Sequence, residues 1–204
     1  VRRVAQSQAL RISVLPSFAH YWLMPRLSSF HAACADITLD IDASLAVQDL
    51  TRKGFDAAIR LGNGQWADMQ AQLIARGEVV PVATPALARQ WQAAFDDGTP
   101  GMPLLEHDVT PWRSWFLVHQ QREYGRPLAS FNDAGLLIRA AEQGFGIALV
   151  KRLLVSDALT EGRLVSLAAA RQLEPVDFYL VWPQNSGLTP GVEALLHWLQ
   201  RQLA

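Results

Sequence analysis

One stretch, Leu10 to Ile41, constrains the fold of this chain most strongly. An apolar run predicts a strand at Leu10–Leu15, the pair Pro16-Ser17 predicts a turn, and alternation predicts a second strand at Ile37–Ile41. Between them, apolar residues recur at helical spacing: Phe18, Tyr21, Trp22, Leu23, Leu27 and Phe30. In such a strand, helix, strand unit the free N–H groups of the helix N-terminus point outward, so the pattern predicts a small-molecule contact at Ser17.

A proline lies inside this predicted helix, at Pro25. Proline lacks an N–H and its ring clashes with the preceding turn, so it is tolerated mainly in the first turn of a helix. Two arrangements follow: regular hydrogen bonding begins near Tyr21 or Trp22, or the helix is kinked at Pro25. Both arrangements predict that Ser17 to His20 forms a shaped, partly free loop.

The second half of the chain repeats the logic of the first. A strand at 128–131 is followed by the cap pair Asn132-Asp133, a helix that ends at Gly144, and a strand at 146–150. No low-complexity tract or clean linker divides the halves. The pattern therefore predicts an α/β protein with two lobes, between which the chain crosses.

The charge balance excludes one function class. The 18 Lys and Arg residues against 19 Asp and Glu residues give a net charge of -1, so no basic excess is present to neutralise a phosphate backbone. We expect no DNA binding by this chain alone. The single cysteine, Cys34, rules out an internal disulfide and fits a reducing compartment. No apolar run approaches the roughly 18 residues of a membrane span, so we expect no membrane contact.

Two patterns resemble cofactor or metal sites by letters only. Gly62-x-Gly64-x-x-Ala67 matches a dinucleotide-binding pattern, but it follows a third strand and opens no amphipathic helix, so a tight turn explains both glycines. His31 and Cys34 are three residues apart on the predicted helix, but no third ligand stands nearby. We expect neither cofactor nor metal. The sequence also lacks the motifs of serine hydrolases, phosphate-binding loops and zinc proteases.

Several motifs, in order, resemble one family. They are Leu10-Arg11-Ile12-Ser13-Val14, Leu23-Met24-Pro25-Arg26-Leu27, Gly54-Phe55-Asp56-Ala57-Ala58-Ile59-Arg60-Leu61-Gly62, Val80-Pro81-Val82-Ala83-Thr84-Pro85 and Glu142-Gln143-Gly144-Phe145-Gly146-Ile147-Ala148-Leu149. Each is weak alone, but their order and spacing over Leu10 to Leu203 resemble the effector-binding domain of LysR-type transcriptional regulators. The segment Gly62 to Trp66 is similar to the branch that contains the glycine-cleavage activator and the β-lactamase regulator.

The resemblance implies a periplasmic-binding-protein-like fold of type 2: two α/β lobes joined by two crossover strands, with a cleft between them. We expect a linker remnant at 1–9, lobe one at 10–80 plus 182–204, and lobe two at 81–181. The family's winged helix-turn-helix precedes this domain and is expected to be absent from this chain, so DNA would be contacted only through that missing part. The family also implies a cytoplasmic protein.

Candidate ligand contacts are the first residues after each strand, because the cleft faces the carboxyl ends of parallel strands. They are Ser17, Phe18, Ser44, Asp49, Arg60, Gly62, Thr84, Asn132, Asp133 and Phe178, with the last placed on lobe two. In the family, the positions that match Ser17, Asp49, Asp133 and Phe178 line or adjoin the effector site. Helix capping is the alternative for Ser17, Asn132 and Asp133, an ion pair for Arg60, and a core position for Phe178.

Three functions remain open at this point. The first is the small-molecule sensing and oligomerisation domain of a LysR-type regulator, which is not an enzyme. The second is a free solute receptor of a transporter, and the third is a small-acid dehydratase on the same scaffold. The enzyme alternative needs a general acid, for which Asp49 and Asp133 are the candidates.

Helix N-termini at Ser17 and Asn132 favour an anion, whereas Asp49 and Asp133 favour an ammonium group. The pattern thus predicts an amino acid or small carboxylate as effector. The resemblance implies a homodimer, or a tetramer in the full-length protein. Its surface would include the strand at 37–42 and the residues His20, Arg26 and His31.

Overall fold

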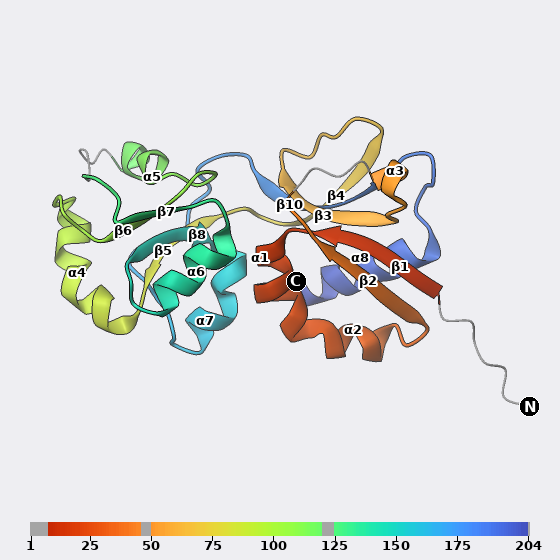
Figure 1. The fold of residues 1–204 in the computed structure, drawn as a ribbon, viewed down its shortest axis with the longest axis horizontal. Coiled ribbons are helices and arrows are strands. Elements are labelled where there is room, and N and C mark those ends of the chain that lie inside the picture. Colours follow the sequence, from red (N-terminus) through yellow and green to blue (C-terminus); the bar gives the residue numbers. More distant parts are fainter. Residues whose placement is uncertain (1–7, 46–49, 120–124, 204) are drawn as a thin grey trace, which may run out of the picture. The chain divides into compact units, whose positions relative to one another are not determined.

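The computed structural model describes residues 8–45, 50–119 and 125–203. The chain divides into two compact units, and the chain passes twice between them (Figure 1). Unit 1 comprises residues 1–76 and 175–204, and unit 2 comprises residues 77–174. Both units contain a five-stranded mixed sheet with helices, so the prediction of two α/β lobes is confirmed.

The sheet of unit 1 has the strand order β2-β1-β3-β10-β4. Strand β1 pairs in parallel with both β2 and β3, whereas β10 pairs antiparallel with β3 and β4. The strands are β1 (Gln8–Val14), β2 (Ile37–Ala43), β3 (Ala57–Gly62), β4 (Met69–Ala75) and β10 (Asp177–Pro183). The helices are α1 (Pro16–Phe18), α2 (Leu27–Ala33), α3 (Leu50–Lys53) and α8 (Pro190–Leu203).

The chain between β1 and α2 is helical from its start, so the prediction of a free loop at Ser17 to His20 is wrong. Pro16 occupies the first position of α1, where its missing N–H is no loss. A π-helical turn, Ala19–Leu23, and a 3₁₀ turn, Met24–Arg26, then follow. These two turns accommodate Pro25 by changing the hydrogen-bond register rather than by delaying the helix.

A side chain compensates for this irregular register. The Arg26 guanidinium donates a hydrogen bond from Nη1 to the carbonyl of Trp22 at 3.1 Å, and its Cζ lies 4.9 Å from the centre of the Trp22 ring. The backbone carbonyl is therefore satisfied without a regular α-helical partner.

Aromatic rings form the core on the helical side of unit 1. Trp198 of α8 packs edge-on against Trp22 at 5.8 Å and against Phe30 at 5.3 Å between ring centres. Phe18 lies 5.0 Å from Trp22 and 5.8 Å from Phe178 of β10. Because these rings come from both ends of the chain, they join the N-terminal and C-terminal segments of the unit.

The sheet of unit 2 has the strand order β7-β6-β8-β5-β9. Strand β6 pairs in parallel with β7 and β8, whereas β5 runs antiparallel to β8 and β9. The elements, in chain order, are β5 (Val79–Ala83), α4 (Pro85–Asp97), β6 (Leu104–His107), α5 (Trp112–Val118), β7 (Ala129–Phe131), α6 (Ala134–Glu142), β8 (Ile147–Lys151), a 3₁₀ turn (Arg152–Val155), α7 (Ser156–Thr160) and β9 (Val165–Ser166).

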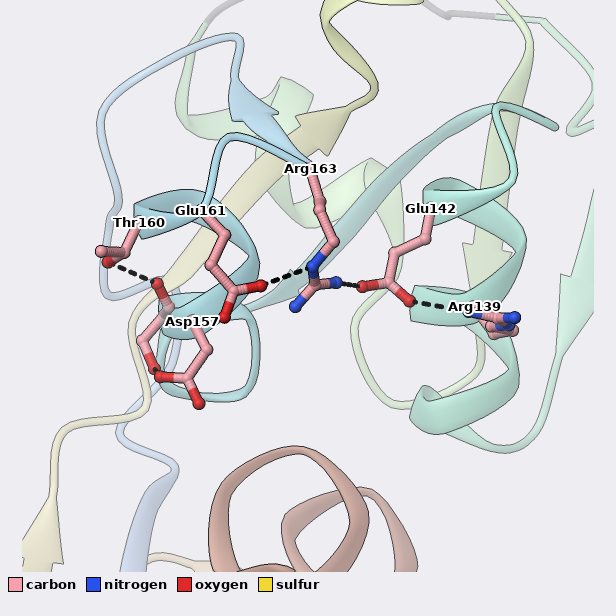
Figure 2. A network of polar contacts seen from close by, with 7 residues as sticks. Arg139, Glu142, Asp157, Thr160, Glu161 and Arg163 are labelled. Carbon is pink, nitrogen blue, oxygen red and sulfur yellow. Dashed lines mark hydrogen bonds and ion pairs between the residues drawn. The ribbon is translucent and has the colours of Figure 1, made fainter. Parts of the chain in front are cut away.

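An ion-pair bridge fixes the turn after α7 to the end of α6 (Figure 2). The Glu142 carboxylate, whose side chain is 7% exposed, pairs with Arg163 and also with Arg139, the latter at 3.6 Å. Arg163 Nε in turn donates to Glu161 at 2.7 Å. A nearly buried carboxylate shared by two guanidinium groups holds this turn more firmly than an exposed pair does.

Within the described residues, none of the helices combines the length and apolar character that crossing a bilayer requires.

Candidate functional site

In each unit, the carboxyl ends of the parallel strands define one edge of the sheet. In unit 1 this edge carries the ends of β1, β2 and β3. Because β10 runs antiparallel to β3, its beginning lies at the same edge, where Asp177 pairs with Gly62. The edge therefore collects the residues that follow three strands and those that open a fourth.

The most notable group at this edge is the buried arginine of β3. Arg60 is 7% exposed, and its Nη2 donates to Ser13 Oγ at 2.7 Å. Its Nη1 donates to the carbonyls of Ser13 at 3.2 Å and Ile59 at 3.0 Å. Burial lowers the pKa of the Arg60 guanidinium, and the negative charge of Asp42 acts in the opposite direction. Hydrogen bonds to β1 and β3 hold the guanidinium, and no ion pair of Arg60 is present among the described residues, in contrast to the strand-end ion pair that was the alternative.

Asp42, near the end of β2, completes this polar cluster. One of its carboxylate oxygens, Oδ1, is buried and accepts no hydrogen bond from the part of the chain that the structure describes. A buried acceptor without a donor is uncommon in proteins. A hydrogen bond donated by a bound ligand is one way to satisfy the Asp42 oxygen. Ser13, Asp42 and Arg60 thus place a cation and an acceptor at one strand edge.

Ser17 lies at the same edge, after β1, and is 7% exposed. It does not cap α1, because the N-cap residue is Leu15 and α1 has no side-chain cap. The capping alternative for Ser17 is therefore wrong. Ser44 follows β2, and its N–H donates to the carbonyl of Val14 at 2.9 Å. Asp49 lies outside the described residues.

The two aromatic candidates of unit 1 belong to its core. Phe18 is 0% exposed and Phe178 is 1% exposed, and the two rings contact each other. Phe178 lies on β10 in unit 1 and not in the second lobe, because β10 pairs with β3 and β4. Both rings are buried core residues of unit 1, and a direct contact of either ring with a ligand stays a prediction.

Gly62 ends β3 for a packing reason. A Cβ on Gly62 would lie 2.7 Å from the Trp66 ring, so the glycine makes room for that side chain. Beside it, Arg76 pairs with the buried carboxylate of Asp177 at 3.0 Å. The glycine positions the turn at this edge, and a contact between Gly62 and a ligand stays a prediction.

In unit 2, the carboxyl ends of β6 and β7 form the corresponding edge. Asp133 is the N-cap of α6, and its side chain accepts a hydrogen bond from the Leu136 N–H at 2.9 Å. Asn132 precedes it and is exposed. The capping alternative thus holds for Asp133, while Asn132 remains free of that role.

The structure separates Thr84 from these residues. Strand β5 runs antiparallel to β8, so Thr84, which follows β5, lies at the opposite edge of the sheet from Asn132 and Asp133. Its hydroxyl is the N-cap acceptor of α4, with the Leu87 N–H at 3.4 Å. The expectation that Thr84 lies with Asn132 and Asp133 is wrong. It required β5 to run parallel to β7, whereas β5 runs in the opposite direction.

A histidine that the sequence patterns did not indicate lies at the unit 2 edge. His107 ends β6, pairs with Phe131 of β7 and is 8% exposed. Burial lowers its pKa, and the charges of Asp108 and Asp133 raise it by less. Sequence reasoning missed His107 and Ser13, because each lies within a strand and not after one. It also missed Asp42, which belongs to β2 although the predicted strand ended at Ile41. The only available signal was a polar residue in an otherwise apolar strand.

We expect the buried His107 to make stability depend on pH. Its folded pKa lies below the unfolded value of about 6.5, so the stabilisation is complete above that pH and is lost as the pH falls toward the folded pKa. The free energy of unfolding should therefore drop between pH 7.5 and pH 5.5, roughly one unit either side of that value. Urea unfolding at both pH values measures it.

The variant His107→Gln should show a smaller drop than the parent chain. The control is His197→Gln, at an exposed position of α8, which should keep the full drop. Glu106 changes stability in the opposite direction, because burial raises its pKa, but it is present in every variant and cancels in the comparison. An equal drop in the His107→Gln variant and the parent contradicts the assignment.

Among residues 8–45, 50–119 and 125–203, no group of three His, Cys, Asp or Glu side chains could hold a metal ion. No geometry of a metal centre therefore arises from the described side chains.

Comparison with known proteins identifies the family of this chain and several of its relatives. The family description "LysR substrate binding domain" matches residues 4–204. The transcriptional regulator PerR of Escherichia coli is 27% identical over 202 residues, which cover 97% of this chain and 67% of that protein. The glycine cleavage system transcriptional activator of Escherichia coli is 28% identical over 202 residues, covering 96% of this chain and 65% of the activator. The chain thus spans about two thirds of the length of these relatives.

A solved structure shows the same architecture. The AmpR effector binding domain from Citrobacter freundii superposes with a TM-score of 0.81 at 26% identity, covering 96% of this chain and 98% of that domain. The resemblance to the branch with the glycine-cleavage activator is confirmed. The curated relatives are transcriptional regulators, which contradicts the transport-receptor and dehydratase alternatives and with them a catalytic role for Asp49 or Asp133.

Proposed function

The chain belongs to the LysR substrate-binding domain family, with its periplasmic-binding-protein-like fold of type 2, and from this premise we propose which effector it senses and how. LysR regulators bind small-molecule effectors and DNA. We propose that this chain binds an amino acid or small carboxylate at the strand edges described above. Binding then shifts the population of conformations that the regulator adopts.

The observation that carries the proposal is the polar cluster of unit 1. Arg60 supplies a buried positive charge, and Asp42 supplies a buried acceptor without a donor among the described residues. A carboxylate is attracted by the first and an ammonium group by the second, so the pair favours a small zwitterion. Ser17, at the same edge, offers a hydroxyl that no cap uses.

Asn132 and Asp133 are proposed as the contribution of unit 2. The exposed Asn132 offers an amide, and Asp133 offers the oxygen that does not cap α6. We retain Asp49 as a proposed contact from the family resemblance. Ser44 and Gly62 are proposed as neighbours of the ligand through their place after β2 and at the end of β3.

Assembly and location follow from the same proposal. We propose a homodimer that uses β2 and the helical segment with His20, Arg26 and His31, with a tetramer as the higher state of the full-length regulator. DNA would be contacted by a separate helix-turn-helix module, as the names of the relatives indicate for those proteins. A regulator that acts on DNA in a bacterium works in the cytoplasm, so we propose that compartment.

A thermal-shift screen of amino acids and small carboxylates tests the effector class. A true effector at 100 times its dissociation constant should add about 2.7 kcal/mol to the free energy of unfolding and raise Tm. The variant Ser17→Ala should weaken the response to that effector roughly tenfold, because one hydrogen bond to a charged group is lost. Light scattering of the same variant should show the oligomeric state of the parent.

Ser186→Ala, an exposed serine between β10 and α8, is the matched control and should respond like the parent. If no amino acid or small carboxylate changes Tm, the proposed effector class is wrong. If Ser17→Ala loses the oligomer instead of the ligand response, the assignment of Ser17 to the effector is wrong.

A further inference from the structure

Unit 2 contains an open groove away from the strand edge proposed for the effector. Its cavity of about 670 Å³ is lined by β5, β9, the 3₁₀ turn after β8 and the end of α7. In the strand order β7-β6-β8-β5-β9, this groove lies at the β5 and β9 side of the sheet. Asn132 and Asp133 follow β7, at the other side. The volume is within the range of small-molecule sites.

Two residues of opposite charge, Glu78 and Arg152, line the groove. The Arg152 N–H donates to the Glu78 carbonyl at 2.9 Å, so the two residues face each other where the pairing of β5 with β8 ends. No hydrogen bond or ion pair joins either side chain to another group of the described chain. The guanidinium and the carboxylate of these neighbouring residues have no partner within the described chain. Together they match a head group whose carboxylate and ammonium groups are attached to the same carbon.

Most of the other lining residues carry apolar side chains, and Ser166 is the polar one among them. Leu159 and Val165 are half-buried and form the apolar wall of the groove, whereas Val80 and Leu164 are buried behind the lining surface. The alanines at 168–170 also line the groove. The backbone N–H groups of these alanines have no partner within the described residues, so they remain available to a polar group of a ligand. The combination favours an aliphatic side chain attached to a charged head group.

The ion-pair bridge described above supports the apolar wall. Arg163 immediately precedes Leu164 and is held by Glu142 and Glu161 (Figure 2). The turn that carries Leu164 and Val165 is thereby fixed to the end of α6. A wall fixed in the free protein lowers the ordering cost of binding.

We propose that this groove is a second binding site of the domain, for an aliphatic α-amino acid. The carboxylate of the ligand pairs with Arg152, its ammonium group pairs with Glu78, and its side chain lies against Leu159 and Val165. The site goes beyond the effector proposed above and requires neither its identity nor its binding.

Isothermal titration of the 204-residue chain with L-leucine tests this site. We expect saturable binding that Arg152→Gln and Glu78→Gln each weaken at least roughly tenfold, because each removes one charge-assisted contact. Isocaproate, which lacks the ammonium group, and isopentylamine, which lacks the carboxylate, should bind at least as weakly. Arg89→Gln, at an exposed position of α4, is the matched control and should bind like the parent.

Amide chemical shifts locate the ligand. In a nitrogen-labelled sample, L-leucine should shift the amides at 168–170, and it should do so in the Ser17→Ala variant as well. Absence of saturable L-leucine binding, or equal affinity in Arg152→Gln, Glu78→Gln and the parent, overturns the proposal. Chemical-shift changes confined to the β6 and β7 edge also overturn it. If Ser17→Ala leaves the binding of every ligand unchanged, only the proposed effector site is contradicted.

Discussion

Replacing Arg60 by methionine is expected to lower the free energy of unfolding by about 3 kcal/mol, since removing one partner from a buried charged cluster leaves the others unsatisfied. Methionine keeps much of the volume but donates no hydrogen bond. Ser13 Oγ loses its donor at 2.7 Å, and Asp42 loses the electrostatic attraction of the Arg60 charge. Urea unfolding of the variant and the parent measures the loss.

Two further variants separate the effect of losing the Arg60 charge from the effect of losing its packing. Arg60→Lys keeps the charge but not the two-nitrogen fork, so we expect a smaller loss. The double variant Arg60→Met with Asp42→Asn should recover part of the stability, because the uncompensated carboxylate is then neutral. A double variant less stable than Arg60→Met alone contradicts the idea that Asp42 depends on the charge of Arg60.

Replacing Trp198 by alanine is expected to cost about 3 to 5 kcal/mol, the usual range for removing a buried tryptophan. The ring is 1% exposed and lies between Trp22 and Phe30. Its Nε1 also donates to Ser29 Oγ at 3.2 Å. Because α8 and the N-terminal helices meet through this ring, its loss should detach α8 first. Hydrogen exchange of the α8 amides measures that effect.

Two matched variants divide the contribution of Trp198. Ser29→Ala removes only the hydrogen bond and should cost about 1 kcal/mol. Trp198→Phe keeps an aromatic ring and should fall between Ser29→Ala and Trp198→Ala. Loss of protection in unit 2 equal to that in α8 contradicts a local role for this cluster.

Much of the fold could be predicted from the sequence, because local signals coincide with tertiary needs. The cap at Asp133 and the left-handed Gly144, with φ of 74°, mark α6 at both ends, as the sequence indicated. Strands β1 and β2 also lie where the apolar run at Leu10–Leu15 and the alternation at Ile37–Ile41 predicted them. These features depend on neighbours within a few residues.

The predictions failed where contacts between residues far apart in the sequence determine the local structure. The helix at Ser17 begins early because Phe18 packs against Phe178, a contact with the far end of the sequence. Thr84 was misplaced because strand direction is a property of the sheet and not of the strand. Strand β6 was not predicted, since its four residues, Leu104–His107, are too short for a periodic signal and its two neighbours, β7 and β8, follow later in the chain.

The place of β10 in its sheet has a consequence for biosynthesis. Strand β10 lies between β3 and β4, so the sheet of unit 1 cannot close until the ribosome has translated the chain through Pro183. Unit 2 is one continuous segment and can fold as soon as residue 174 has left the exit tunnel. During that interval β3 and β4 have unpaired edges, which are open to pairing with other nascent chains. Slow translation of residues 175 to 204 would therefore favour aggregation through unit 1 and leave unit 2 intact.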